Sequence, residues 1–157
     1  MVAGILANVV FARQCPNWSY IHYGTRPMST VVTRVPAAQS TRALAHFETR
    51  LSFETDCADV WYATQHETKD FVLLDVRTPT FYAAGHVPGA INMPTRTISE
   101  QRLAEYSPDT VFVVYCAGPH CNGANKAAVK LAQLGRPVKE MIGGLTGWID
   151  EGFGLER

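Results

Sequence analysis

The most restrictive feature of this 157-residue chain is a run of strand-forming residues that ends in a cysteine. Residues 110–115, Thr-Val-Phe-Val-Val-Tyr, are followed directly by Cys116. A short loop with two glycines leads into a segment in which alanine and leucine, from Ala124 to Leu134, recur at helical spacing. Such a loop and helix N-terminus present backbone N–H groups that bind anions and stabilise a thiolate. The pattern favours an enzyme whose cysteine attacks an anionic sulfur, phosphorus or arsenic centre.

The length suits one compact domain of ordinary size, and the charges of the chain balance. The 14 basic and 14 acidic residues give no indication of nucleic-acid binding, and no apolar run is long enough to span a membrane. Four irregularly spaced cysteines argue against a disulfide framework and favour a reducing compartment. The Cys-x4-Cys segment lacks a second pair of ligands, so we expect no structural zinc site.

The acidic residues are unevenly distributed along the chain. None occurs before Glu48, and from that position onward 10 basic and 14 acidic residues give a net charge of −4. We interpret residues 1–35 as an N-terminal extension that is poorly ordered and unrelated to the chemistry, and residues 36–157 as the folded domain. An acid-free segment with scattered arginines is also typical of a mitochondrial transit peptide. We predict a cytoplasmic protein, and organelle targeting is the alternative.

Beyond Pro36, predicted helices and strands alternate. Strands are predicted at residues 71–76, 90–93, 110–115 and 138–142. Helices are predicted to start after the N-caps Ser40, Asp56 and Ser99, at Pro79, and over residues 124–134 and 145–153, with Leu44, Phe47 and Leu51 on one face of the first. This order implies a parallel sheet with right-handed crossovers, whose functional site lies outside the carboxyl ends of the strands. Cys116 lies at such an end.

Four landmarks in this order resemble the rhodanese (sulfurtransferase) family. They are Leu-Leu-Asp75-Val-Arg77, Ala-Gly-His86-Val-Pro-Gly-Ala90, the strand that ends in Cys116, and Gly143-Gly144 with Trp148 and Glu151-Gly152. The resemblance spans residues 50–157, about two-thirds of the chain. It implies an α/β, rhodanese-like three-layer fold with a five-stranded parallel sheet flanked by helices. It also implies that Cys116 carries a persulfide.

The loop after Cys116 departs from the family pattern. Rhodanese loops contain an arginine or another basic residue, whereas residues 117–122 here read Ala-Gly-Pro-His-Cys-Asn. The cell-cycle tyrosine phosphatases built on the same fold need an arginine six residues after the cysteine, and Asn122 occupies that position. We therefore expect neither phosphatase nor arsenate chemistry, and we expect inefficient turnover of the thiosulfate dianion.

The sequence predicts a sulfurtransferase that uses no metal and no organic cofactor. The Cys116 thiolate would take a sulfane sulfur from a small donor (thiosulfate, polysulfide or a persulfide) and pass it to a thiol or cyanide-like acceptor. We expect neither a nucleic acid nor a membrane as partner, and the oligomeric state is not predicted. The predicted substrate-binding loop consists of Ala117, Gly118, Pro119, His120, Cys121 and Asn122.

Several residues near Cys116 have two interpretations each. Cys121 is either a resolving thiol for Cys116 or a small apolar residue at the start of the helix. His120 either donates a hydrogen bond to the thiolate or the donor, or is an idle loop residue. Asp75 and Arg77 are predicted to support the site, mainly by bracing loops at the edge of the sheet.

Two other functions remain open at this point. The first is a thiol-disulfide redox enzyme or sensor that uses Cys116 and Cys121. The second is a non-catalytic rhodanese-like module in which Cys116 is an unreactive buried thiol.

Overall fold

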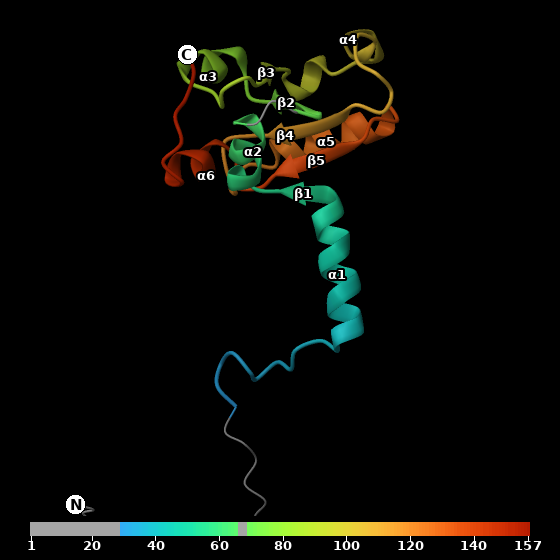
Figure 1. Cartoon of the computed structure of the whole chain (residues 1–157), viewed down its shortest axis with the longest axis vertical. Coiled ribbons are helices and arrows are strands. Elements are labelled where there is room, and N and C mark those ends of the chain that lie inside the picture. Colours follow the sequence, from blue (N-terminus) through green and yellow to red (C-terminus); the bar gives the residue numbers. More distant parts are fainter. Residues whose placement is uncertain (1–28, 66–68) are drawn as a thin grey trace, which may run out of the picture. The chain divides into compact units, whose positions relative to one another are not determined.

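The computed structural model of the protein describes residues 29–65 and 69–157 (Figure 1). Its helices and strands all belong to one compact unit, Ala38–Arg157. The predictions for residues 1–35 fall mostly on residues 1–28, which lie outside the described residues. Residues 29–35 are exposed.

Five parallel strands form one sheet in the order β1-β5-β4-β2-β3. The strands are β1 (Glu54–Thr55), β2 (Phe71–Asp75), β3 (Ile91–Asn92), β4 (Val111–Tyr115) and β5 (Val138–Met141). The flanking helices are α1 (Ser40–Phe53), α2 (Cys57–Thr64), α3 (Pro79–Ala84), α4 (Glu100–Leu103), α5 (Gly123–Gln133) and α6 (Gly144–Asp150), and a short 3-10 helix covers Thr95–Thr97. The predicted fold class, a five-stranded parallel sheet flanked by helices, is confirmed.

The central strand β4 divides the core into two layers by the alternation of its side chains. Phe112, Val114 and Cys116 belong to the layer packed against α4 and α5. Val113 and Tyr115 belong to the layer on the other face, which contains Cys57 and Val60 of α2, Met141 of β5 and Trp148 of α6. The pleat of one strand therefore places the Cys116 side chain on the α5 face of the sheet.

Two of the three predicted N-caps are confirmed. The Asp56 carboxylate accepts a hydrogen bond from the Asp59 amide at 2.8 Å, and the Ser99 hydroxyl accepts one from the Arg102 amide at 3.4 Å. The prediction for Ser40 is wrong by one residue, because Ser40 is already helical and Gln39 is the cap. Gln39 makes no side-chain capping bond, but its carbonyl accepts the Ala43 amide at 2.9 Å and so closes the first turn.

Glycines set the C-terminal ends of the two helices nearest the site. α5 ends as predicted before Gly135, whose φ of +71° lets the Arg136 amide reach the Leu131 carbonyl at 3.0 Å. α6 is shorter than the predicted 145–153 segment, because Gly152 has a φ of +79° and the Phe153 amide turns back to the Trp148 carbonyl.

The predicted apolar face of α1 is not buried in this chain. Leu44, Phe47 and Leu51 are 61%, 57% and 68% exposed, and α1 contributes no buried residue to either core layer. The helical period thus correctly predicts the helix, but it does not show what covers its apolar side.

Candidate active site

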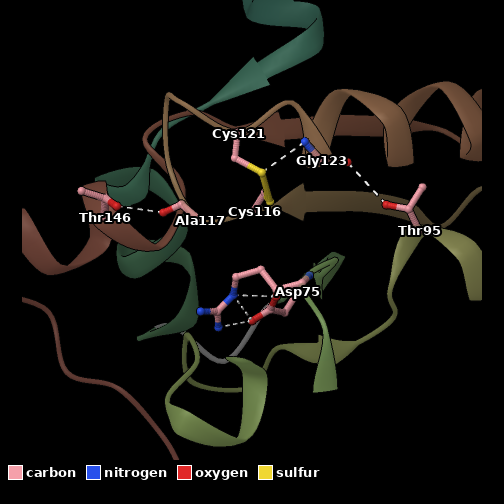
Figure 2. The surroundings of a disulfide bond; sticks show 8 residues. Asp75, Thr95, Cys116, Ala117, Cys121, Gly123 and Thr146 are labelled. Carbon is pink, nitrogen blue, oxygen red and sulfur yellow. Dashed lines mark hydrogen bonds and ion pairs between the residues drawn. A yellow bond between two sulfur atoms is a disulfide. The ribbon is translucent and has the colours of Figure 1, made fainter. Parts of the chain in front are cut away.

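The Cys116 loop is fastened to the start of α6 by backbone hydrogen bonds. The Leu145 amide donates to the Cys116 carbonyl at 3.0 Å, and the Thr146 amide and hydroxyl both donate to the Ala117 carbonyl at 2.9 Å. Figure 2 shows the Thr146–Ala117 contact beside the sulfur atoms. This fastening fixes the first two residues of the loop independently of its tip.

Two glycines allow these segments to approach so closely. A Cβ atom on Gly144, whose φ is +58°, would lie 2.6 Å from the Cys116 carbonyl oxygen and 2.9 Å from the Gly118 nitrogen. A Cβ atom on Gly118 would lie 2.7 Å from the Thr146 hydroxyl oxygen. Any larger residue at these positions would push α6 away from the loop.

Cys116 and Cys121 are joined by a disulfide bond, with their Cα atoms 6.4 Å apart (Figure 2). The Gly123 amide, at the first residue of α5, donates a hydrogen bond to the Cys121 sulfur at 3.4 Å. A Cβ atom at position 123 would lie only 2.6 Å from the Cys116 sulfur and 3.3 Å from the Cys121 sulfur. The two sulfurs can therefore meet because Gly123 has no side chain to occupy the space between them and the backbone.

The Cys121 side chain also packs against the apolar layer that contains Cys116. The two interpretations of this residue are consequently compatible in geometry: it packs as a small apolar residue, and its sulfur reaches that of Cys116.

The Cys116 side chain is 8% exposed and borders a small pocket of about 180 Å³. The pocket lies between the loop, the end of β5 and the start of α6, and is lined by Cys116, Gly118, Pro119, Cys121, Ala124, Asn125, Glu140, Met141, Ile142, Gly143 and Gly144. Among these lining residues none is basic, and the only charged side chain is that of Glu140.

Glu140 is a site residue that the sequence analysis missed. It lies on β5 next to Val114 of β4, and its carboxylate accepts a hydrogen bond from the Asn125 side chain of α5. Burial raises the pKa of the Glu140 carboxyl, the Asn125 hydrogen bond lowers it, and the nearby Glu54 raises it further, so that the net shift is upward. The signal was present, since the carboxyl ends of β4 and β5 meet at one edge of the sheet.

A second, more open depression of about 510 Å³ lies along the loop. It is lined by Ala117, Pro119, His120, Cys121, Asn122 and Asn125. The exposed His120 thus borders this second depression and not the Cys116 pocket, so the structure does not place its ring in that pocket. Cys121 borders both hollows and forms part of the wall between them.

Several backbone amides of the loop are free to bind an anion. Among the described residues, the amides of Ala117, Gly118, His120 and Asn122 have no hydrogen-bond acceptor. α5 begins directly behind the loop, and Asn122 at its N-cap makes no side-chain capping bond. The partial positive charge of a helix N-terminus stabilises a thiolate or a bound anion.

Asp75 and Arg77 form a buried, bidentate ion pair beneath this site. The Arg77 Nε donates to both Asp75 oxygens at 3.0 Å, and its Nη2 donates to Asp75 at 2.5 Å and to the Gly85 carbonyl at 2.8 Å. Burial lowers the pKa of Arg77, but the hydrogen bonds and charge of Asp75 raise it, and the net shift is upward. Neither residue lines the Cys116 pocket, so their contacts brace the 85–87 turn.

Cys57 has the environment of an unreactive thiol. It lies in the opposite core layer, is 5% exposed, and donates to the carbonyls of Ile142 and Gly144 at 3.5 Å. Burial, followed by the charges of Asp56 and Glu151, raises its pKa from 9.0 to about 11.

Within residues 29–65 and 69–157, no group of three or more His, Cys, Asp or Glu side chains is arranged to hold a metal ion. No helix in the same ranges has both the length and the apolar character needed to cross a bilayer.

A cysteine at the carboxyl end of the central strand, followed by a loop and a helix N-terminus, defines a class of α/β proteins with a thiol site. The comparison with family models identifies the member of that class: residues 59–151 match the rhodanese-like domain. The chain belongs to the rhodanese-like domain family, and the resemblance seen in the sequence is confirmed.

Individual relatives have different names. The chain is 38% identical over 94 residues to the HTH-type transcriptional regulator Rv0324 of Mycobacterium tuberculosis, and the match covers 56% of this chain but only 41% of that protein. It is 34% identical over 90 residues to a sulfurtransferase of Allochromatium vinosum, a match covering 55% of this chain and 79% of the relative. The crystal structure of the BH2092 protein from Bacillus halodurans is similar with a TM-score of 0.73 and 40% identity, over 75% of this chain and 86% of that one.

Proposed function

We propose that this protein is a rhodanese-type sulfurtransferase in which Cys116 carries a persulfide. The position of Cys116 supports the proposal, because it lies at the end of β4, in front of α5 and beside a pocket bordered by loop backbone. The sulfurtransferase of Allochromatium vinosum, similar over most of its own length, provides independent support.

The reduced Cys116 thiolate attacks the sulfane sulfur of the donor, and a new S–S bond forms. The bond from that sulfur to the rest of the donor breaks, and the leaving sulfite or thiolate takes the electron pair. Loop amides without an acceptor, first of all that of Gly118 on the pocket wall, supply hydrogen bonds to the terminal sulfur. A thiol or cyanide-like acceptor then attacks this sulfur and regenerates the Cys116 thiolate, without a metal or an organic cofactor.

The charges of the pocket favour persulfide donors of lower charge over the thiosulfate dianion. The pocket has no basic side chain among its lining residues, and Glu140 contributes a carboxylate. A thiosulfate dianion would meet repulsion from this carboxylate with no arginine fork to offset it.

Intact-protein mass spectrometry tests the proposal directly. The fully reduced protein is exposed to polysulfide or thiosulfate, desalted and weighed, with Cys116→Ser and Cys121→Ser measured in parallel. We expect an increment of about 32 Da per sulfur in the Cys121→Ser protein and none at position 116 in the Cys116→Ser protein. A Cys116 that stays unmodified by both donors would contradict the proposal.

A second candidate function is a thiol-disulfide redox enzyme or sensor, which the Cys116–Cys121 bond supports. It predicts rapid disulfide formation with peroxide and no dependence on a sulfur donor. The third alternative, a non-catalytic module, predicts that reduced Cys116 resists iodoacetamide at neutral pH, as Cys57 should. The regulator-named relative shows that a similar domain forms part of a longer chain.

A further inference from the structure

We propose that Cys121 is a second catalytic thiol, which attacks the Cys116 persulfide and releases its outer sulfur as hydrosulfide. This inference rests on the proposed sulfurtransferase function, because it starts from Cys116 loaded with sulfur. It adds a defined product, and it adds a requirement for a dithiol reductant that restores the two thiols.

The disulfide identifies which sulfur Cys121 reaches. A persulfide offers two sulfur atoms to a nucleophile: attack on the outer atom would move the sulfane sulfur to Cys121, whereas attack on the inner atom expels it. The inner atom is the Sγ of Cys116, and this is the atom joined to Cys121 in the structure. The Cα separation of 6.4 Å lies within the range that disulfides allow. The loop conformation therefore suits attack on the inner sulfur.

The backbone at Gly123 prepares Cys121 for this attack. Its amide donates to the Cys121 sulfur at 3.4 Å, from the first residue of α5. A hydrogen bond to sulfur and a helix N-terminus both favour the thiolate over the thiol, and the thiolate is the reactive form. A side chain at Gly123 would occupy the space in which the two sulfurs meet.

The pocket gives the departing sulfur a place and an exit. It borders both Cys116 and Cys121, and its volume of about 180 Å³ exceeds what one added sulfur atom needs. The Glu140 carboxylate on its wall disfavours retention of an anion, so hydrosulfide leaves.

Atoms and electrons balance in this step. The Cys121 thiolate donates an electron pair to the Cys116 Sγ, and the Cys116–Cys121 bond forms as the persulfide S–S bond breaks. The outer sulfur leaves with the electron pair of that bond and the persulfide proton, as hydrosulfide. The sulfane sulfur is reduced to sulfide while the two cysteines are oxidised to the disulfide.

Reduction then proceeds through the second, more open depression. Cys121 borders this depression, whereas Cys116 does not line it and is 8% exposed. A dithiol attacks the Cys121 sulfur and displaces the Cys116 thiolate, which the N-terminus of α5 stabilises as a leaving group. The second thiol of the reductant resolves the mixed disulfide and frees Cys121.

The experiment follows one turnover in protein that carries Cys15→Ser, so that only Cys57, Cys116 and Cys121 remain. Reduced protein is loaded briefly with polysulfide and desalted, and then sulfide release and intact mass are recorded over time. We expect about one sulfide per loaded chain and a final mass about 2 Da below that of the reduced protein. The rate should not depend on protein concentration, because the attack is intramolecular.

Cys121→Ser and Cys121→Ala are the decisive variants, and Cys57→Ser is the matched control. Both Cys121 variants should keep the added sulfur of about 32 Da and release sulfide at least about tenfold more slowly, whereas Cys57→Ser should behave like the parent. Equal sulfide release with and without Cys121 would overturn the inference and leave the sulfurtransferase proposal intact. Fragment masses that place the added sulfur on Cys121 would also overturn it. Failure of the Cys121 variants to take up any sulfur would overturn both proposals together.

Discussion

The hydroxyl of Tyr115, the residue immediately before Cys116, donates a 2.8 Å hydrogen bond to the carboxylate of Asp75. The Tyr115 hydroxyl oxygen in turn accepts a hydrogen bond from the Val87 amide at 3.0 Å. Tyr115 thereby connects two distant segments on one face of the sheet, while Cys116 points to the other face. Tyr115 therefore braces the end of the strand on the face opposite to the Cys116 sulfur.

Tyr115→Phe should lower the free energy of unfolding. The substitution leaves the buried Val87 amide without its acceptor and removes one donor from Asp75, which typically costs about 1–3 kcal/mol. Urea unfolding followed by circular dichroism measures the loss. Tyr82→Phe removes one hydrogen bond, to the Ala90 carbonyl, at a more exposed position and should cost less. Sulfur loading of Cys116 should survive at low temperature, since Tyr115 does not line the pocket.

Gly144→Ala should destabilise the protein and impair sulfur loading. An alanine at this position would have to keep the backbone φ of +58°, and its Cβ would lie 2.6 Å from the Cys116 carbonyl oxygen. Together these effects cost about 1–3 kcal/mol or force the loop to move. Gly154→Ala is the matched control, because nothing lies within 4 Å of its added Cβ. Thermal unfolding and mass increments compare the pair. If both variants unfold at the same temperature and take up sulfur equally, the close approach of α6 to the loop is not needed for either property.

Cys57→Ser should reduce the loss of unfolding free energy that the wild type shows as the pH becomes alkaline. The folded-state pKa of Cys57 is raised from 9.0 to about 11, so the folded protein retains this proton longer than the unfolded chain. The wild type consequently loses stability as the pH rises from about 9 towards 11, and below that range the thiol causes no loss. Unfolding free energies of both proteins at several pH values isolate the difference from other titrating groups. In the reduced protein at pH 8, Cys57 should resist iodoacetamide while Cys116 reacts.

Glu140→Gln should improve the use of thiosulfate. Removing a charge beside a partly solvated pocket changes the energy of a dianion by about 1 kcal/mol, and the expected gain in kcat/KM is several-fold and up to about tenfold. A neutral trisulfide donor should show little change. Asp109→Asn, which removes a charge just before the opposite end of β4, serves as control. The glutamine still accepts a hydrogen bond from Asn125, so stability is preserved.

The same variant makes a prediction about pH. Because the folded-state pKa of Glu140 is raised, this carboxyl stays neutral to a higher pH than an ordinary glutamate. The thiosulfate advantage of Glu140→Gln should therefore vanish in acid and grow as the pH rises through that pKa. An advantage that is constant with pH would show that charge at position 140 is not its cause.

Strong local signals made most of the fold predictable. The uninterrupted apolar runs of β2 and β4, the Asp56 and Ser99 caps and Gly135 each act within a few residues, so the sequence alone locates them. β1 was missed, because its two residues, Glu54 and Thr55, form a strand only through their neighbour β5.

The part of the site that depends on local sequence could be predicted, and the part that depends on neighbouring elements could not. The position of Cys116 follows from the strand that precedes it, and the spacing left the contact with Cys121 as one of two interpretations. Glu140 and Asn125 reach the pocket only once β5 and α5 are placed beside each other. The failure of His120 to line that pocket likewise depends on the turn that the loop makes between Gly118 and Cys121.

The close approach of Gly144 to Cys116 has a consequence for protein engineering. The loop and the beginning of α6 share three hydrogen bonds and a spacing that only glycine permits. A loop transplanted from another rhodanese will therefore not find the hydrogen bonds and spacing that hold it in place unless residues 143–146 are exchanged with it. The smallest unit that can be grafted from this chain is therefore discontinuous: the loop after Cys116 and residues 143–146 have to be transferred as a pair.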